Sequence, residues 1–363
     1  MRVLEVCVAL DGGGIDRYLY NYCTHTVGVS YDFAVVDTGR EGMLEPPLRA
    51  RGWAVYRVPR LRVGILRNAR ALCRIMRQGC YDAVHVHLGE KSLIALLCAK
   101  RCGIGVRIAH AHIADAPEGR AARVLRLLLR SLTRRAATAL SACGERAGAF
   151  VWGERAMARG EVTLCRNALE IEAYAYSDER RAAARAALGI DATAMVVGHV
   201  GRLCAQKNQL RLLEMFVEVL RRRSDAHLLL VGEGELREQI EQRAAALGIA
   251  ERVILTGVRE DVGALLCAMD VMMFPSTHEG LPFALLEAQC SGLPVVCSDA
   301  ITREVALSDG VRFLPLTASD AEWAAVSCEH AMRERCPAEA ALRRAGYDVE
   351  REAARLVELY RTK

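Results

Sequence analysis

Short apolar runs alternate with longer stretches of helical periodicity from one end of the chain to the other. This alternation predicts β-α-β units and therefore an α/β protein with parallel sheets. In the first half the expected strands are Arg2–Leu10, Phe33–Asp37, Ala54–Val58, Ala83–Leu88, Val106–His112 and Thr138–Ala142, with helical stretches that include Ile15–Cys23 and Leu66–Gln78. Together they predict a doubly wound, Rossmann-like domain.

A second series of the same kind begins after Asn167 and a polar, helix-rich connector. Its expected strands are Met195–Val200, His227–Val231, Arg252–Leu255, Asp270–Phe274, Pro294–Ser298 and Val311–Leu314. The clearest helix is Gln209–Arg223, where Leu210, Leu213, Val217 and Leu220 share one face. We therefore expect two domains with a boundary near residues 165–190, and a ligand site at the carboxyl ends of the strands, in the cleft between the domains.

Composition narrows the class of protein. Of the 363 residues 52% are hydrophobic and 26% charged, which predicts a soluble globular chain rather than a disordered or membrane-embedded one. No apolar run approaches the roughly 20 residues that cross a bilayer, and Arg2 leads into a strand rather than a signal sequence. The 14 cysteines form no C-x-x-C pair, so we expect buried thiols in a reducing, cytoplasmic compartment.

Two glycine-containing loops follow the first expected strand of each domain. Gly12-Gly13-Gly14 opens a helix whose N-terminus could receive a phosphate, although a plain tight turn explains it nearly as well. In the second domain, the loop Gly201-Arg-Leu-Cys-Ala-Gln-Lys-Asn places Arg202 and Lys207 five residues apart. The two cations could bracket a diphosphate, and a solvated loop is the alternative.

The segment "FPSTHEGLPFALLEA" carries the strongest signal. A strand ends at Phe274, Glu279 lies in the loop, Pro282 stands at the expected first helical residue and Glu287 lies in the second turn. The amides of Gly280 to Phe283 could hold an anionic group between two carboxylates that accept hydrogen bonds from hydroxyls. This pattern fits a polyhydroxylated ligand containing a diphosphate, and the alternative is a solvated helix start.

Four histidines occupy alternate positions on two neighbouring strands: His85 and His87, then His110 and His112. Without a carboxylate at ligand spacing or a D-x-D pair we expect no metal, and we interpret His85 and His110 as packed, hydrogen-bonded histidines. His112 ends its strand and is the one expected to face the cleft.

Charge is distributed unequally. Residues 1–150 carry 23 Lys and Arg against 12 Asp and Glu, whereas the remainder carries 26 against 32. Within the basic half, residues 119–139 interleave six arginines with leucines, which predicts a basic amphipathic helix. It could contact an anionic membrane, or be a solvated surface helix.

Taken together, these motifs resemble the family-4 glycosyltransferases, retaining enzymes of GT-B fold that transfer a sugar from a nucleotide-sugar. The resemblance covers nearly the whole chain through "YDAVHVH", "VRIAHAH", "CRNALEIEAY", "GRLCAQKN", "LVGEGELR", "LTGVREDV" and "HEGLPFALLEAQCSGLPVVCSD". The details "RIAHAH" and "ACGERAGAFVWG" are most similar to bacterial enzymes of capsular and exopolysaccharide biosynthesis. Ala168 and Leu169 depart from the family's usual glycine and isoleucine after the asparagine.

The resemblance implies a role for each matching residue. Arg202 and Lys207 would neutralise the leaving diphosphate, Glu279 would contact the donor sugar, and Glu287 the ribose hydroxyls. His112 would lie near the reacting sugar. The remaining donor-binding positions are Gly13, Gly14, Gly232, Gly234, Leu236, Gly257, Arg259, Gly280, Leu281, Pro282 and Phe283. No metal and no cofactor would be needed.

It also implies an organisation and a function. Residues 1–168 would form an acceptor-binding domain, 169–345 a nucleotide-sugar-binding domain, and 346–363 a terminal helix that crosses back to the first. The expected partners are a nucleotide-sugar, most simply a UDP-sugar, and a glycan or lipid-linked acceptor at the inner face of the membrane, with no nucleic acid. Two alternatives are a nucleotide-sugar epimerase of the same fold and a non-catalytic partner subunit of another glycosyltransferase. A dinucleotide oxidoreductase is disfavoured because the first glycine loop lacks G-x-G-x-x-G.

Overall fold

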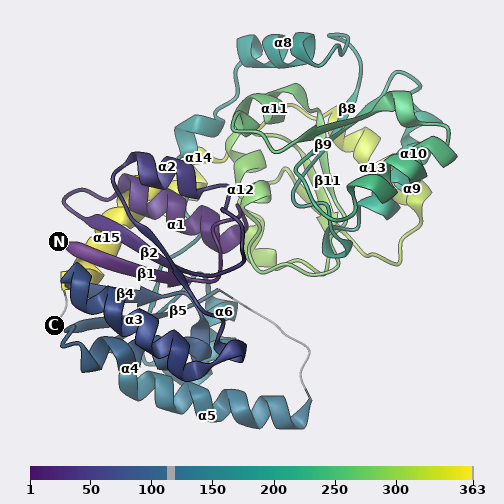
Figure 1. The fold of residues 1–363 in the computed structure, drawn as a ribbon. Coiled ribbons are helices and arrows are strands. Elements are labelled where there is room, and N and C mark those ends of the chain that lie inside the picture. The colour runs from purple at the N-terminus through teal and green to yellow at the C-terminus, as the bar shows by residue number, and fades with distance from the viewer. Residues whose placement is uncertain (113–118, 362–363) are drawn as a thin grey trace. The chain divides into compact units, whose positions relative to one another are not determined.

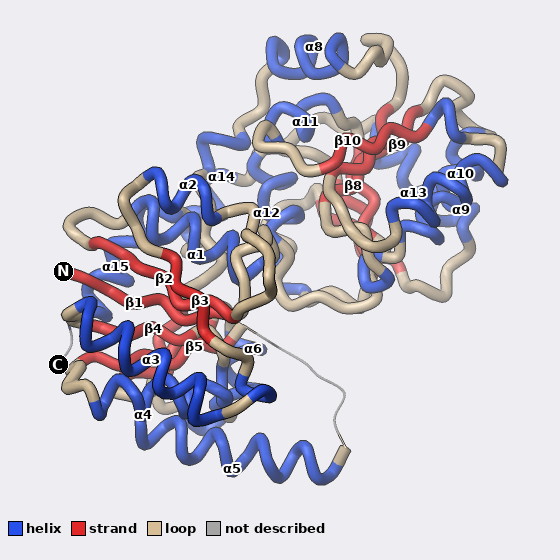
Figure 2. Tube along the Cα trace, viewed as in Figure 1, coloured by secondary structure: helices blue, strands red, loops and turns tan. Residues whose placement is uncertain are grey.

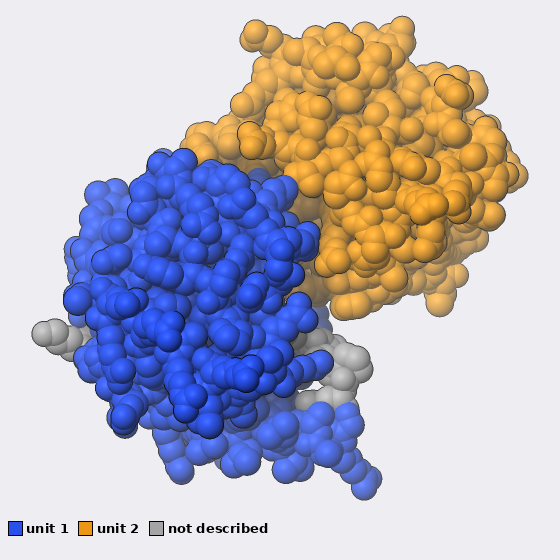
Figure 3. Space-filling model, viewed as in Figure 1, with its two compact units in different colours: residues 1–168, 346–363 blue, residues 169–345 orange. Residues whose placement is uncertain are grey.

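The computed structural model describes residues 1–112 and 119–361. The chain divides into two compact units, Met1–Ala168 together with Gly346–Lys363, and Leu169–Ala345 (Figure 3). Each unit is described here by itself. Within the described ranges, no helix combines the length and the apolar character that crossing a membrane requires.

Unit 1 is built on a seven-stranded sheet in the order β3-β2-β1-β4-β5-β6-β7, with all neighbouring strands parallel. The strands are β1 Arg2–Cys7, β2 Ser30–Val36, β3 Val55–Val58, β4 Ala83–Val86, β5 Val106–Ala111, β6 Ala139–Ala142 and β7 Val162–Leu164. The helices are α1 Gly14–His25, α2 Glu45–Ala50, α3 Ile65–Gly79, α4 Leu93–Arg101, α5 Arg120–Ala136, α6 Glu145–Trp152, α7 Glu154–Ala158 and α15 Val349–Arg361.

Helices cover both faces of this sheet, as a doubly wound fold requires (Figures 1 and 2). Helices α1 and α15 pack together on one side, although more than 300 residues separate them along the chain. Helices α3 and α4 lie on the other side, where Leu72, Met76 and Leu96 join the strands in a continuous apolar core. The alternation of apolar runs therefore predicted the fold class correctly.

Unit 2 contains a six-stranded parallel sheet in the order β10-β9-β8-β11-β12-β13. Its strands are β8 Val196–Val200, β9 His227–Val231, β10 Val253–Gly257, β11 Val271–Phe274, β12 Val295–Ser298 and β13 Val311–Leu314. Its helices are α8 Asp178–Ala187, α9 Gln209–Leu220, α10 Arg237–Ala246, α11 Val262–Ala268, α12 Phe283–Cys290, α13 Asp320–Ala331 and α14 Glu339–Arg344. Both units therefore share one architecture.

The buried face of α9 differs from the sequence expectation. The fully buried positions include Leu212, Phe216 and Val219, whereas Leu210 and Val217 lie at the edge of the core. The helix also ends at Leu220 rather than at Arg223. The buried face of α9 is wider than the sequence pattern predicted, because α13 and α10 both pack against this helix.

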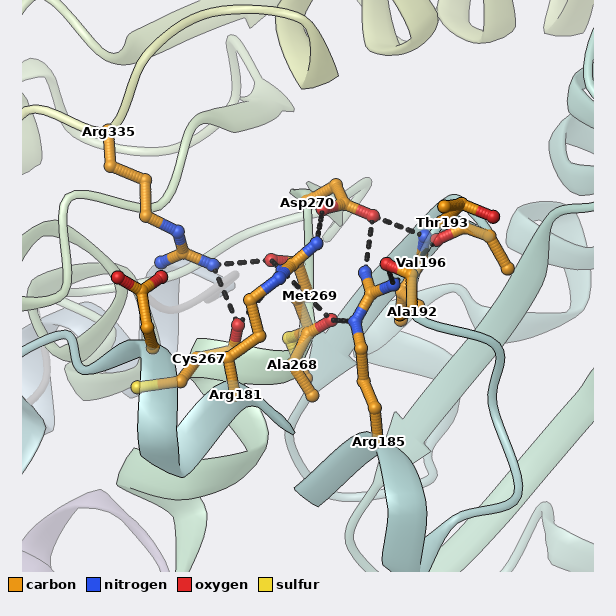
Figure 4. A network of polar contacts seen from close by, with 12 residues as sticks. Arg181, Arg185, Ala192, Thr193, Val196, Cys267, Ala268, Met269, Asp270 and Arg335 are labelled. Carbon is orange, nitrogen blue, oxygen red and sulfur yellow. Dashed lines mark hydrogen bonds and ion pairs between the residues drawn. The ribbon is translucent and has the colours of Figure 1, made fainter. Parts of the chain in front are cut away.

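An arginine cluster holds the connector helix α8 against the sheet of unit 2 (Figure 4). Arg181 and Arg185 each donate to one oxygen of Asp270, at 2.6 and 2.8 Å. Arg335 donates to the carbonyls of Leu266, Cys267 and Met269 at the end of α11. The last turn of α11 leaves carbonyls without helical partners, and these guanidinium groups satisfy them.

Candidate functional site

The loops after β8, β9 and β10 are joined by backbone hydrogen bonds at the carboxyl edge of the unit 2 sheet. The Gly201 amide donates to the Val231 carbonyl at 2.9 Å, and the Gly232 amide to the Gly257 carbonyl at 2.9 Å. A Cβ at Gly234 would lie 2.1 Å from the Leu203 carbonyl oxygen, so only glycine allows this approach. These loops therefore pack closely at glycines that the sequence motifs contain: Gly201, Gly232, Gly234 and Gly257.

Lys207 and Glu279 form a close ion pair from two different loops. Lys207 Nζ lies 2.6 Å from Glu279 Oε1, with exposed side-chain fractions of 14% and 9%. The ammonium also lies 4.6 Å from the centre of the Phe274 ring at the end of β11. The cation and the carboxylate are thus paired at the carboxyl edge of the unit 2 sheet and largely removed from water.

Hydrogen bonds fasten the two loops that supply this pair. The Thr277 amide donates to the Gln206 carbonyl at 2.9 Å, and the Gln206 side-chain amide donates to the His278 carbonyl at 2.8 Å. Asn208, which precedes α9 in the left-handed conformation with φ 60°, donates to the Pro275 carbonyl. Lys207 is therefore positioned by its neighbours on both sides.

Glu287 lies buried in the second turn of α12. Its Oε1 accepts a hydrogen bond of 2.9 Å from the Tyr174 hydroxyl, in the segment Ile171–Tyr174 that opens unit 2. Tyr174 was not predicted from the sequence, because nothing in "EIEAY" indicates which distant residue its hydroxyl contacts. Helix α12 begins at Phe283, so Pro282 is its N-cap rather than its first residue. The amides of Gly280, Leu281 and Phe283 lie at this helix start.

Arg202 and Arg259 are placed differently from Lys207. The Arg202 side chain is 71% exposed and pairs with Glu235 at 3.0 Å. Arg259 pairs with Asp261 at 2.7 Å on the surface after β10, and Leu236 precedes α10. The structure therefore places Arg202 beside the loop after β9 and leaves its side chain in solvent, whereas Lys207 is held in place.

In unit 1 the glycine loop is organised by Asp16. Gly13 is the N-cap of α1, and the Asp16 carboxylate accepts hydrogen bonds from the amides of Asp11 and Gly13, at 2.8 and 3.0 Å. Burial raises the pKa of Asp16 to about 6, against the effect of these backbone hydrogen bonds, which lower it. The Gly13 amide thus has an internal hydrogen-bond partner at the start of α1.

The four histidines form one hydrogen-bonded cluster at the carboxyl ends of β4 and β5. His85 Nε2 lies 3.1 Å from His110 Nδ1, and His87 Nδ1 lies 2.8 Å from His112 Nε2. Ring nitrogens of His85, His87 and His110 all lie within 4.8 Å of one another, yet both nitrogens of His85 and of His87 already have hydrogen-bond partners. The packed, hydrogen-bonded histidines expected from the sequence are present. Both ring nitrogens of His85 and His87 are satisfied, whereas His110 Nε2 is buried without a partner among the described residues.

Two residues of this cluster were missed by the sequence analysis. Glu5 of β1 accepts from His87 at 2.7 Å, and Tyr360 of α15 bonds both Glu5 and His85. A lone acidic residue inside the apolar strand "RVLEVC" is a signal of a buried functional carboxylate that could have identified Glu5. No pattern in the sequence indicates that Tyr360 reaches it.

Comparisons with known proteins identify relatives of this chain. A profile described as "Glycosyl transferases group 1" matches residues 194–331. The chain is 32% identical to "Putative glycosyltransferase EpsF" of Bacillus subtilis, over 99% of this chain and 96% of that protein. It is 24% identical, over 64% of its length and 62% of the relative, to the "UDP-Gal:alpha-D-GlcNAc-diphosphoundecaprenol alpha-1,3-galactosyltransferase" of Escherichia coli.

The fold matches solved structures of the same kind. The structure of HepE from Anabaena in complex with UDP-glucose superposes with a TM-score of 0.74, at 19% identity and over 99% of both chains. At this identity the likeness concerns the fold, and two Rossmann-like units with parallel sheets are the GT-B architecture.

Proposed function

The chain belongs to the group 1 glycosyltransferases, of the family-4 type with GT-B fold, and we propose that it transfers a sugar from a UDP-sugar, with retention, to a hydroxyl of a lipid-linked or glycan acceptor. The relative from Escherichia coli is a UDP-galactose transferase that acts on a sugar linked to diphosphoundecaprenol, which supports a UDP-linked donor and an acceptor on a lipid diphosphate. The observation that carries the proposal is the Lys207–Glu279 pair beside the carboxyl end of β11.

In this proposal Lys207 and Arg202 stabilise the leaving diphosphate. Negative charge grows on the phosphate oxygen as its bond to the anomeric carbon breaks, so a fixed cation lowers the barrier more than it stabilises the ground state. The exposed Arg202 exchanges its surface partner Glu235 for a phosphate at little cost, because a surface ion pair contributes little. Glu279 holds Lys207 in place and accepts from the donor sugar.

Glu287 receives the ribose hydroxyls. A carboxylate has two oxygens and about four acceptor positions, of which Tyr174 takes one. The amides of Gly280 to Phe283 surround the sugar and phosphate, and the loops carrying Gly232, Gly234, Leu236, Gly257 and Arg259 contact the base and ribose. In unit 1, His112, Gly13 and Gly14 contact the transferred sugar.

The proposed transfer uses neither a metal nor a covalent intermediate. The acceptor oxygen forms the new bond to the anomeric carbon, the bond to the UDP oxygen breaks on the same face, and the acceptor proton passes to the leaving phosphate oxygen. The cationic side chains supply the charge stabilisation that a metal supplies in other transferases.

The donor site is tested by thermal unfolding with UDP, GDP, ADP and their glucose, galactose and N-acetylglucosamine conjugates, with and without EDTA. A ligand that binds only the folded chain raises the melting temperature. We expect one UDP compound to raise it, EDTA to leave the shift unchanged, and Glu287→Gln to reduce it. The matched control is Glu241→Gln, which removes the carboxylate of an exposed ion pair with Arg237 on α10.

Product analysis separates the alternatives. Conversion of the UDP-sugar to its epimer without an acceptor identifies an epimerase, and the absence of a shift with every nucleotide contradicts a donor site. An inverted anomeric configuration in the product, read by NMR, contradicts retention.

Helix α5 supports a further part of the proposal, contact with an anionic membrane. Its side chains Leu125 and Leu128 are each 55% exposed, and the helix contains six arginines without an acidic residue. Arg126 and Arg134 bond the carbonyls of Phe150 and Trp152 and so fasten the inner side of the helix. Exposed leucines flanked by arginines suit the boundary between headgroups and acyl chains of acidic lipids. Such contact would bring a lipid-linked acceptor within reach.

Vesicle sedimentation tests this contact. We expect the chain to sediment with phosphatidylglycerol vesicles and not with phosphatidylcholine vesicles, and high salt to weaken the binding. The double variant Leu125→Ser/Leu128→Ser should lose this binding. The control Met332→Ser, which replaces an even more exposed apolar residue of unit 2, should not. Equal binding to both vesicle types, or equal loss in the control, contradicts the proposal.

A further inference from the structure

Glu5 stands at the origin of a hydrogen-bond chain that ends at His112. Its Oε2 lies 2.7 Å from His87 Nε2, and His87 Nδ1 lies 2.8 Å from His112 Nε2. Glu5 and His87 are buried; Glu5 lies on β1, and His87 directly follows β4, the strand next to β1 in the unit 1 sheet. The first two members of this hydrogen-bond chain are therefore shielded from water, and the third, His112, is partly exposed.

The direction of each hydrogen bond follows from Glu5. An ionised carboxylate can only accept, so His87 carries its proton on Nε2. A neutral His87 then has a lone pair on Nδ1 and must accept from its partner. His112 is consequently protonated on Nε2, and its Nδ1 keeps a lone pair. The Glu5 carboxylate thus determines the tautomer of His112 through two successive hydrogen bonds.

The electrostatics agree with this assignment. Burial alone would raise the pKa of Glu5, but the charges and hydrogen bonds of His85 and His87 lower it to about 2. Burial lowers the pKa of His87 to about 4 and that of His112 well below its usual value. At neutral pH the chain therefore holds an ionised glutamate and uncharged imidazoles.

The rings are also held in orientation. His112 stacks on His110 with ring centres 4.1 Å apart, and the edge of Tyr18 packs against it at 5.2 Å. Tyr360 donates to the second oxygen of Glu5 at 2.8 Å, which fixes the carboxylate from the side of α15.

We propose that Glu5 and His87 are positioning residues that hold His112 in the neutral, Nε2-protonated tautomer, so that Nδ1 accepts a hydrogen bond from a hydroxyl of the transferred sugar. This inference rests on the proposed role of His112 at the sugar. It assigns the buried glutamate of β1 to the reaction although Glu5 itself touches no substrate.

Glu5→Gln is expected to reverse the donor and acceptor roles in the hydrogen bonds from residue 5 to His112. Tyr360 donates toward the position of Oε1, so the amide oxygen of the glutamine stays there and its NH2 group faces His87. His87 Nε2 must then accept, His87 Nδ1 donates, and His112 becomes protonated on Nδ1. The variant therefore presents a donor where the wild type presents an acceptor.

The primary test is imidazole NMR with ¹⁵N-labelled histidine, which distinguishes protonated from unprotonated ring nitrogens without any measurement of activity. We expect His112 in the wild type to be protonated on Nε2 and in Glu5→Gln on Nδ1. Glu5→Asp, which remains an acceptor, should keep the wild-type tautomer. Protonation of Nδ1 in the wild type overturns the proposal, and so does an unchanged tautomer in Glu5→Gln.

Kinetics give the second readout. We expect Glu5→Gln to lower kcat about tenfold or more with a change in donor KM below about threefold, and Glu5→Asp to recover part of the loss. The matched control is Asp32→Asn, a buried carboxylate of the neighbouring strand β2 that also accepts from a tyrosine. It should change stability but neither kcat nor the His112 tautomer.

The two proposals fail separately. If the chain transfers no sugar but the NMR result holds, the proposed function fails and the tautomer assignment stands. If transfer is observed and Glu5→Gln retains full kcat, the function stands and the positioning role is refuted.

Discussion

The Lys207–Glu279 pair illustrates how much a single contact determines in this protein. Two side chains from loops 72 residues apart meet at 2.6 Å, and each limits the motion of the other. Such a pair stabilises the fold modestly, because much of the attraction offsets the loss of hydration of the two charges. In the proposed reaction its larger effect is to hold a cation in a defined place before the substrate arrives.

Removing that cation should reduce turnover far more than it reduces folding. For Lys207→Met we expect kcat to fall by about 10²- to 10³-fold, the loss typical of one preorganised stabilising group. Because Glu279 would be left without its cation, the melting temperature should fall too. The double variant Lys207→Met/Glu279→Gln should recover the melting temperature but not kcat. Arg221→Ala, an exposed arginine at the end of α9, is the control and should change neither.

Close backbone approach sets a second residue-scale expectation. A Cβ at Gly234 meets the Leu203 carbonyl at 2.1 Å, whereas one at Gly310 meets nothing closer than 3.4 Å. We expect Gly234→Ala to lower the free energy of unfolding by about 1 to 3 kcal/mol through overpacking, and Gly310→Ala to leave it nearly unchanged. Urea unfolding of the two variants measures the difference, and equal values would contradict the close approach.

At the scale of elements, α8 depends on a network rather than on its own sequence. Helix α8 contacts α11, and Arg181 and Arg185 share Asp270 at the start of β11. Arg185 is almost fully buried, and burial lowers its pKa, partly offset by the Asp270 charge, which raises it. An arginine in such a position is acceptable only while the carboxylate remains.

Asp270→Asn should therefore destabilise unit 2 strongly. We expect the free energy of unfolding to fall by about 3 to 5 kcal/mol, because a buried guanidinium loses its counter-charge. Asp225→Asn, which breaks the exposed pair with Arg223, should cost less than about 1 kcal/mol. Urea unfolding of both variants measures these free energies of unfolding. A similarly small decrease in each would show that the arginine network contributes little to stability.

At the scale of the whole molecule, the buried histidines make stability depend on pH. Burial lowers the pKa of His87 to about 4 and those of His110 and His112 well below the usual value near 6.5. The unfolded chain binds these protons more readily, so their contribution is complete above pH 6.5 and is lost as the pH falls toward 4. Asp16, with its raised pKa, acts in the opposite sense between about pH 4 and 6. In unit 2 burial lowers the pKa of His199 to about 4 and also lowers those of His227 and His330.

We expect acid to destabilise unit 1 more than unit 2. Trp53 and Trp152 report on unit 1, and Trp323 reports on unit 2. Fluorescence-monitored urea unfolding of the variants Trp323→Phe and Trp53→Phe/Trp152→Phe, compared at pH 7 and pH 5, separates the two. The midpoint should fall further for the unit 1 reporters, and an equal or greater fall for Trp323 would contradict the buried-histidine explanation.

The sequence alone determined the fold class and most of the elements. His227–Val231 and Val311–Leu314 are strands within the expected bounds, because short apolar runs between polar segments have few other ways to be buried. Edges were less certain: β1 ends at Cys7 rather than Leu10, and β7, three residues long, was not expected. The short edge strand β7 forms because it pairs with β6. The local sequence does not show that such a partner strand is available.

The motifs around Lys207, Glu279 and Glu287 were likewise recognisable, since loops and helix starts impose local residue choices. Only the tertiary structure decided which side chains meet. Tyr174 bonds Glu287 across 113 residues, and Tyr360 bonds Glu5 across 355. Periodicity and motif spacing report only on residues that are near one another in the sequence. These contacts instead depend on how distant elements pack. For that reason the sequence predicted the candidate site residues, and only the folded chain decided which distant side chains contact them, as Glu5 and His87 do in the hydrogen-bond chain to His112.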